Sequence, residues 1–235
     1  MVFIKGGVFQ MGRNDVLPKG ANIYDSQYPA HPVTVEDFYL DKTEVTNEEY
    51  AEFVRAKKYK SPDNWQKGNP SAGQERFPVT NISYFDATNF AAWMSSRDKV
   101  LCRLPTEEEW EYAARSGSQQ LIYPWGGEWN PARTNFASGT VREAGATGDE
   151  TVVGNIQDMM GNVLEWTFSK FEYYPAFPEN KKENSAGKIT VRGVSFTREK
   201  AETLQKTDLL LTLRQAVSPD KKFDFLGFRL VCNPK

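Results

Sequence analysis

The chain has 235 residues and a formal net charge of −2, with 29 basic and 31 acidic residues. That length is enough for one large domain with a buried core, or for two small ones. The near balance of charge gives no global positive field that would favour nucleic acid. A mean hydropathy of −0.61 indicates a soluble globular protein. The sequence contains no apolar run of the roughly 18 to 20 residues that a membrane-spanning helix needs.

The first residues lack the regions of a secretory signal peptide. Because such a segment can be removed from a mature chain, export stays open. An extracytoplasmic location is therefore compatible with the sequence, which does not fix the compartment.

Three helix starts are visible. Thr46 and Glu49 form a capping box, Ser83 begins a second helix, and Thr106 begins a third after Pro105. Apolar residues follow each start at helical spacing. Glu107, Glu108 and Glu109 fill the first turn of the third helix, where carboxylates suit the positive end of the helix dipole. We interpret these three as solvated capping residues rather than as an active site.

Short strands are predicted beside the helices, with no alternation of strand and helix that would indicate a parallel sheet. The predicted strands are 2–4, 33–35, 38–40, 189–191, 209–213 and 227–231. Residues 116–188 are mostly turn-rich loop, and a loop of that length needs packed aromatics, a metal or a ligand to hold it. We expect one α+β domain spanning residues 1–235.

Two cysteines, Cys102 and Cys232, lie far apart in the chain. Their spacing matches no redox motif, and we expect buried free thiols, with a disulfide between them as the alternative.

A series of ordered motifs resembles the formylglycine-generating enzyme (sulfatase-modifying factor) superfamily over nearly the whole chain. The motifs are Phe9-Gln10-Met11-Gly12, Pro29-Ala30-His31-Pro32-Val33, Lys42-Thr43-Glu44-Val45-Thr46-Asn47, Pro78-Val79-Thr80-Asn81-Ile82-Ser83-Tyr84, the run from Arg103 to Arg115, Gly161-Asn162-Val163-Leu164-Glu165-Trp166 and Gly227-Phe228-Arg229. The resemblance implies a variant C-type-lectin-like fold, with little regular structure around a small antiparallel sheet and a few helices.

Family resemblance does not fix function, since one scaffold hosts unrelated tasks. Members of this superfamily include copper-dependent oxidases, iron-dependent sulfoxide synthases, ligand-binding variable proteins, gliding-motility lipoproteins and domains of bacterial protein kinases. The oxidases hold Cu(I) with two thiolates shortly after an Arg-Gly-Gly-Ser sequence, and soft thiolates are what Cu(I) prefers. Here the matching segment begins Arg192-Gly193-Val194-Ser195, and no Cys or His occurs between Arg192 and Arg229. We therefore expect no copper.

The iron-dependent branch needs more than one imidazole, and His31 is the one histidine of this chain. It lies in a motif that resembles a scaffold element of the family, so we expect it to be structural.

Calcium needs only oxygen ligands, which loops supply readily. The segment from Asp158 to Trp166 resembles the family's calcium loop. The resemblance implies ligation by the side chains of Asp158 and Glu165 and by the carbonyls of Gly161 and Val163.

A second calcium site is implied more weakly. Asn135 and Phe136 resemble its start, and Asp149 and Thr151 stand at matching distance downstream.

The alternative to calcium is that Glu165 pairs with an arginine while Asp158 and Asn135 cap turns.

The leading functional hypothesis is a non-catalytic binding or sensory domain, part of a bacterial surface, motility or signalling protein, with a protein or peptide ligand. The competing hypothesis is a formylglycine-generating oxidase that acts on a sulfatase cysteine. Loop aromatics such as Trp125, Trp129, Phe171, Tyr173 and Tyr174 could anchor a partner, but they are more typical of the filling of a loop-rich core.

Overall fold

The computed structural model describes residues 1–14, 26–197 and 211–234. In chain order its elements are β1 (Val2–Ile4), β2 (Gly7–Met11), β3 (His31–Val35), β4 (Phe38–Leu40), α1 (Asn47–Lys57), α2 (Tyr84–Asp98), β5 (Leu101–Arg103), α3 (Glu107–Ala114), η2 (Gly117–Gln119), η3 (Pro131–Arg133), β6 (Leu164–Lys170), η4 (Glu179–Lys181), β7 (Ile189–Arg192), β8 (Arg214–Val217), β9 (Leu226–Gly227) and β10 (Val231–Asn233). Short helices and strands joined by long loops confirm the expected α+β class.

The strands of this part of the chain form two four-stranded sheets and one two-stranded ribbon. The orders are β1-β4-β10-β5 and β8-β7-β6-β9, and β2 pairs with β3. Every pair is antiparallel except β6 with β9. Because β1 and β10 lie in one sheet, the two ends of the chain are held in the same layer.

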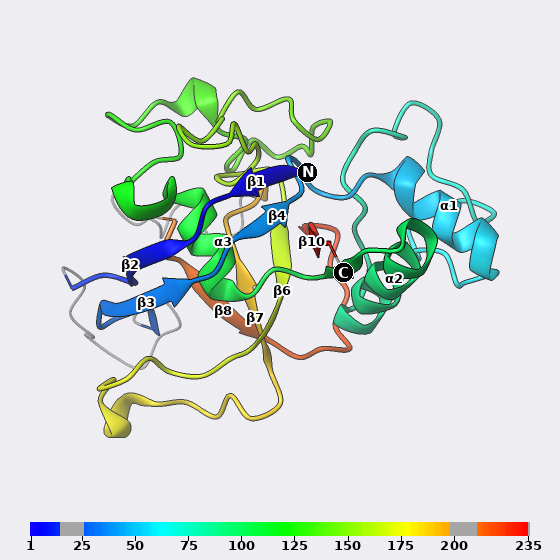
Figure 1. Cartoon of the computed structure of the whole chain (residues 1–235). Coiled ribbons are helices and arrows are strands. Elements are labelled where there is room, and N and C mark those ends of the chain that lie inside the picture. Colours follow the sequence, from blue (N-terminus) through cyan, green and yellow to red (C-terminus); the bar gives the residue numbers. More distant parts are fainter. Residues whose placement is uncertain (15–25, 198–210, 235) are drawn as a thin grey trace.

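Figure 1 shows how these layers are arranged. Helices α1 and α2 lie together on one side of the molecule, and the β2–β3 ribbon lies on the opposite side. The sheet that contains β6 and β7 runs between them, with α3 packed beside it. None of the helices in the described ranges is both long enough and apolar enough to cross a bilayer.

The three predicted helix starts are confirmed, and each is a full capping box. The pairs are Thr46 with Glu49, Ser83 with Asp86 and Thr106 with Glu109. In each pair the N-cap side chain accepts from the backbone of the third residue, whose carboxylate accepts from the N-cap backbone. This satisfies amide groups that a helix start leaves without partners.

The interpretation of the α3 carboxylates as solvated caps is wrong for Glu107 and Glu109, whose exposed fractions are 5% and 8%. Glu107 accepts a hydrogen bond from Arg214 Nη2 at 2.6 Å, and Glu109 binds Arg103 as well as its own cap. The sequence pattern shows the helix dipole but not the arginines of β8 and β5, which the fold brings to this helix end. Only Glu108 remains partly exposed.

The expectation of free thiols is also wrong, since Cys102 and Cys232 form a disulfide. The two residues stand directly opposite each other in the antiparallel pair of β5 and β10. Cross-strand neighbours of this kind place their Cβ atoms within bonding reach. The spacing of 130 residues in the sequence carries no sign of that pairing.

Several strand predictions need correction at their boundaries. The strand predicted over 209–213 lies partly outside the described residues, and the observed strand, β8, begins at Arg214. The strand predicted over 227–231 is divided, because Phe228 to Leu230 separate β9 from β10. Strands β2, β5 and β6 were not predicted. They are short or lack a clear alternation of apolar and polar residues, which is the signal that sequence reading depends on.

The loop aromatics mostly fill the core, as their composition favoured. Phe171 and Tyr174 are each 5% exposed, and their rings lie on the guanidinium of Arg214. Trp125 stacks on Tyr123. These contacts give the long loops a packed interior.

Candidate functional site

Two regions of the structure correspond to the metal sites that the sequence analysis considered. One is the segment after β7, where the copper-binding relatives place their chemistry. The other is the group of loops between η3 and β6, where calcium is expected.

The segment after β7 begins with a buried cation. Arg192 is fully buried and donates to Glu111 of α3. Gly193 follows with a φ of +91°, a backbone conformation that favours glycine. Val194 and Ser195 are then buried at 7% and 8% exposure.

A cavity of about 430 Å³ opens beside this segment. Its volume lies in the range of small-ligand pockets, about 300–1,000 Å³. It is lined by Phe136, Leu164, Lys188, Gly193, Val194, Ser195, Thr197, Leu213, Arg214, Gln215, Ala216, Val217, Ser218, Lys221, Phe223, Phe225 and Leu226. This set contains apolar and aromatic side chains, hydroxyls and cations, but no thiol and no imidazole.

Copper-thiolate chemistry therefore finds no ligands here. The sequence contains only two cysteines, and both are consumed by the disulfide between β5 and β10. His31 lies in β3, where its Nδ1 is 3.2 Å from the carbonyl oxygen of Pro29 and its ring contacts Tyr174. These contacts are consistent with the structural role expected for His31.

The two predicted calcium segments lie side by side. Asn135 forms an isolated parallel bridge with Gly161, and Asn162 N donates to the Asn135 carbonyl oxygen. Gly161 has a φ of +145°, and a Cβ at this position would lie 2.6 Å from Asn135 N. Only glycine permits this approach, which holds the backbone at Gly161 against the backbone at Asn135.

Asp149 and Asp158 meet through one hydroxyl. Thr147 Oγ1 lies 2.5 Å from Asp149 Oδ1 and 2.7 Å from Asp158 Oδ1. A hydroxyl has one proton, so it can donate to only one of these carboxylates at a time. Asp149 also accepts from the backbone amides of Asp158 and Met160. The two carboxylates thus stand close together in a buried position.

Asn135 contributes an oxygen to the same region. The side chain is fully buried, and its Nδ2 donates to Thr140 O and Asn162 Oδ1. Its Oδ1 has no hydrogen-bond partner within the described residues. A buried oxygen without a partner is rare, and a bound ion or a water molecule would satisfy it.

Glu165 is placed differently. Its Oε2 accepts from Arg229 Nε at 2.8 Å and from Trp110 Nε1 at 2.9 Å, and its Oε1 accepts from Arg229 Nη2 at 2.8 Å. In the structure Glu165 pairs with an arginine, which is the alternative to calcium ligation given in the sequence analysis. Both carboxylate oxygens are therefore already bound.

Glu44 completes the cluster and was not singled out from the sequence as a site residue. It is 1% exposed, accepts from Asn162 Nδ2 at 3.1 Å, and has an Oε2 without a partner in the described ranges. Burial and the charge of Asp158 raise the pKa of Glu44 well above its ordinary value. Burial and the same charge raise the pKa of Asp149 to about 6.

The balance of charge in this cluster is negative. Burial alone would lower the pKa of Arg229, but Glu165, Glu44 and Asp158 together raise it. Three carboxylates, those of Glu44, Asp158 and Glu165, thus share one buried arginine, and Asp149 lies next to Asp158. Uncompensated buried charge is costly unless it is protonated or paired with a cation.

The donor set fits calcium at Asn135 and Asp149 better than at Glu165. The first position has an unpartnered amide oxygen and a carboxylate, and Phe136 and Thr151 are the other residues that the resemblance implies there. The second would require Glu165 to share its oxygens with Arg229. Within the described ranges no three His, Cys, Asp or Glu side chains converge on one metal position, so carbonyl ligands are needed in either case. Which of the two segments binds calcium stays a prediction.

These loops and sheets define a class of protein. The arrangement is shared with the solved structure of PvdO from Pseudomonas aeruginosa, at a TM-score of 0.76 and 24% identity over 98% of this chain and 93% of that one. The fold is therefore the variant C-type-lectin-like scaffold that the motifs implied.

The family follows from sequence comparison. The model of the sulfatase-modifying factor enzyme 1-like domain matches residues 1–234, and the chain belongs to this family. It is similar to inactive C-alpha-formylglycine-generating enzyme 2 of Mus musculus, with 33% identity over 97% of this chain and 84% of the relative. It is also similar to the formylglycine-generating enzyme of Mus musculus, with 28% identity over 97% of this chain and 74% of the relative.

Proposed function

We propose that this chain is a non-catalytic member of its family that binds a protein or peptide ligand. The observation that carries the proposal is the absence of thiolates and imidazoles between Arg192 and Arg229. A copper centre of the oxidase type requires thiolates at that place, and the two cysteines of the chain are joined elsewhere.

The similarity to a relative named as inactive supports this proposal. The similarity to formylglycine-generating enzyme keeps an oxidase as the competing function. The scaffold itself cannot separate the two, because an active site depends on particular side chains rather than on a fold. The absence of copper-binding thiolates favours a non-catalytic binding function over an oxidase.

The cavity beside β8 supports ligand binding. Seventeen of the described residues line it, and most of them are apolar or uncharged. Cavities of this composition bind ligands through apolar contact, with a few polar groups that orient the ligand.

Incubation with copper, oxygen and a sulfatase-type cysteine peptide tests the proposal. Mass spectrometry of the peptide should show unchanged cysteine, while the formylglycine-generating enzyme of Mus musculus converts the peptide under the same conditions as a positive control. Conversion by this chain above the level without protein would overturn the proposal in favour of the oxidase.

We also propose that calcium occupies the loops of Asn135 and Asp149 and stabilises the scaffold. The unpartnered Asn135 oxygen and the surplus of buried carboxylates support this. When bound, calcium would supply positive charge between the carboxylates and cross-link two loops without taking part in a reaction.

We propose further that the chain works in an oxidising compartment, as part of a bacterial surface, motility or signalling protein. The disulfide between β5 and β10 supports the compartment, because structural disulfides persist outside the reducing cytosol. Fractionation of native cells with an antibody to this domain tests it. Recovery of the protein in the cytosol with reduced cysteines would contradict it.

A further inference from the structure

The cavity described above has one whole strand in its lining. All four residues of β8, from Arg214 to Val217, line it. Strand β8 is the edge of its sheet, and within the described ranges no strand pairs with its outer side. A strand of this length extends roughly 13 Å at about 3.3 Å per residue. The side of the cavity that β8 forms is therefore about one short strand in length, and we call the cavity the β8 groove.

The two ends of the β8 groove differ in charge. Ile189 pairs with Val217, so Lys188 and Ser218 lie at one end of the β7–β8 pair. Lys221 N donates to the Ser218 carbonyl oxygen, which keeps Lys221 at the same end. Two lysines of the lining thus mark one end of the groove.

The opposite end carries hydroxyls instead. Arg192 pairs with Arg214, so the segment that contains Ser195 and Thr197 follows at that end. The hydroxyls of Ser195 and Thr197 lie 2.8 Å apart and bond to each other. This end therefore offers neutral polar groups.

The floor between the ends is apolar. Leu164 and Leu226 are 6% and 1% exposed. The rings of Phe223 and Phe225 stack with centroids 5.0 Å apart and planes inclined by 9°. Burial of apolar side chains against such a floor contributes about 25 cal/mol for each Å² removed from water.

The charge of the groove is not compensated by its own lining. Among the described residues no aspartate or glutamate lines it. Arg214 is paired with Glu107 beneath the sheet. Neither Lys188 nor Lys221 has an ion pair within the described ranges, whereas the neighbouring Lys222 pairs with Asp86 at 2.9 Å. In the part of the chain that the structure describes, two lysine charges are therefore left for a ligand.

We propose that the β8 groove binds an extended peptide segment whose apolar side chains lie on the floor and whose carboxylates meet Lys188 and Lys221. The proposal rests on the non-catalytic binding function and names the chemistry of its ligand. An extended peptide suits the site because an edge strand offers main-chain partners along its length. The lysine end then selects acidic residues through charge complementarity.

The experiment begins with selection from a displayed library of random short peptides on the folded protein with its disulfide intact. Selected sequences should combine aromatic or aliphatic residues with adjacent Asp or Glu. Binding is then measured by fluorescence polarisation with three labelled, C-terminally amidated peptides, Phe-Leu-Phe-Val-Asp-Asp, the same peptide ending in Asn-Asn, and the same peptide ending in Lys-Lys. We expect the acidic peptide to bind at least about tenfold more tightly than the basic one, with the difference shrinking at high salt.

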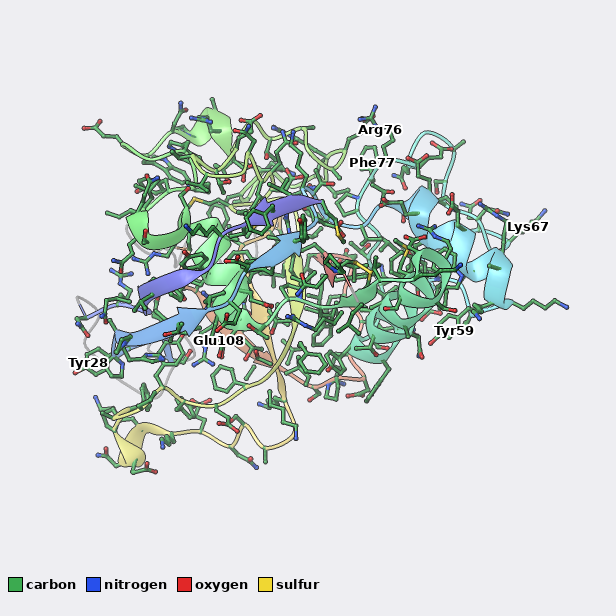
Figure 2. All side chains as sticks on the ribbon, viewed as in Figure 1. Tyr28, Tyr59, Lys67, Arg76, Phe77 and Glu108 are labelled. Carbon is green, nitrogen blue, oxygen red and sulfur yellow. A yellow bond between two sulfur atoms is a disulfide. The ribbon has the colours of Figure 1, made fainter. Side chains whose placement is uncertain are left out.

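The double variant Lys188→Glu/Lys221→Glu should reverse this preference. The matched control is Lys57→Glu/Lys67→Glu, which makes the same change of charge at exposed lysines. Figure 2 shows Lys67 at the outer end of the α1 side of the molecule, far from β8 in Figure 1. The control should leave the preference of the wild type unchanged. Circular dichroism confirms that both double variants fold.

The outcomes separate this inference from the proposed function. An empty selection, neutral or basic selected peptides, or acidic binding that the Lys188→Glu/Lys221→Glu variant retains would overturn the inference and leave the absence of catalysis intact. Conversion of the sulfatase-type cysteine in the copper assay would instead overturn the proposed function.

Discussion

Arg229 binds Glu165 through two nitrogens, Nε to Oε2 and Nη2 to Oε1, each at 2.8 Å, and both side chains are wholly buried. Arg229 also donates to the carbonyl oxygens of Asp41 and Gln157, so one guanidinium joins β6 to two loops. Planar, bidentate pairing is the geometry that arginine offers and lysine does not. This pair holds the loops at Asp41 and Gln157 against β6.

Removal of the disulfide should lower stability without changing the fold. The double variant Cys102→Ser/Cys232→Ser opens a loop of 130 residues, and cross-links of about this length stabilise by roughly 2–5 kcal/mol. Urea unfolding with and without a reducing agent measures the loss. The wild type should respond to the reductant and the variant should not. Equal unfolding curves for both proteins under oxidising conditions would show that the cross-link adds nothing.

Replacement of Glu107 should be far more damaging than replacement of its neighbour. Glu107→Gln leaves Arg214 buried without its 2.6 Å carboxylate partner, and breaking a buried ion pair costs about 3–5 kcal/mol. Glu108→Gln, at a partly exposed position of the same helical turn, should cost less than about 1 kcal/mol. Chemical denaturation of the two variants gives the comparison. Similar losses for both would mean that the Glu107 carboxylate is not buried beside Arg214.

These two carboxylates also show where sequence reasoning ends. The capping boxes at Thr46, Ser83 and Thr106 were visible because a cap involves residues three positions apart. The partner of Glu107 is 107 positions away, and nothing local indicates it. The disulfide escaped prediction for the same reason.

In the candidate site too, some residues are visible from sequence motifs and others only from the fold. Motif resemblance found Asn135, Asp149, Asp158 and Glu165, and the structure brings the first three into adjoining loops and places Glu165 in β6. The motif resemblance did not single out Glu44 or Thr147 as site residues. Their roles depend on the fold, which places Glu44 against Asn162 and Thr147 against Asp149 and Asp158. Within the Glu-Val-Thr-Asn motif, the burial of Glu44 beside Asn162 and Asp158 becomes visible only in three dimensions.

Stability should depend on pH through Asp41. Leu230 N donates to Asp41 Oδ2 at 3.0 Å, and burial, only partly offset by this bond, raises the pKa of Asp41 from 3.8 to about 7. A raised carboxyl pKa means that the folded state holds more protons than the unfolded state in that window. The free energy of unfolding should therefore fall as pH rises from about 4 to about 7, with a slope of up to about 1.4 kcal/mol for each pH unit.

The variant Asp41→Asn tests this dependence. Asparagine retains an oxygen that accepts from Leu230 but cannot ionise, so the slope should become shallower. Glu44 contributes in the same direction, so some slope should remain. The exposed Asp220→Asn change controls for the loss of one negative charge. Identical slopes for wild type and Asp41→Asn in urea titrations across this range would contradict the role assigned to Asp41.

Calcium should raise the melting temperature of the wild type, because an ion that binds only the folded state stabilises it by mass action. At a calcium concentration about a hundredfold above Kd the gain is roughly 2.7 kcal/mol, which is about 5 to 10 °C for a chain of this size. Thermal unfolding with excess calcium and with chelator measures this increment, and titration against a fluorescent chelator gives the number of ions bound.

Two substitutions decide which loop holds the ion. Asp149→Asn removes the one carboxylate of the proposed Asn135 site, and it should abolish the calcium increment relative to its own chelated sample. Glu165→Gln should lower the melting temperature with and without calcium, because it leaves Arg229 buried without its partner, yet it should keep the increment. The reverse pattern would assign the ion to Asp158, Gly161, Val163 and Glu165. Equal melting temperatures for the wild type in calcium and in chelator would mean that packing and the Arg229–Glu165 pair alone hold these loops.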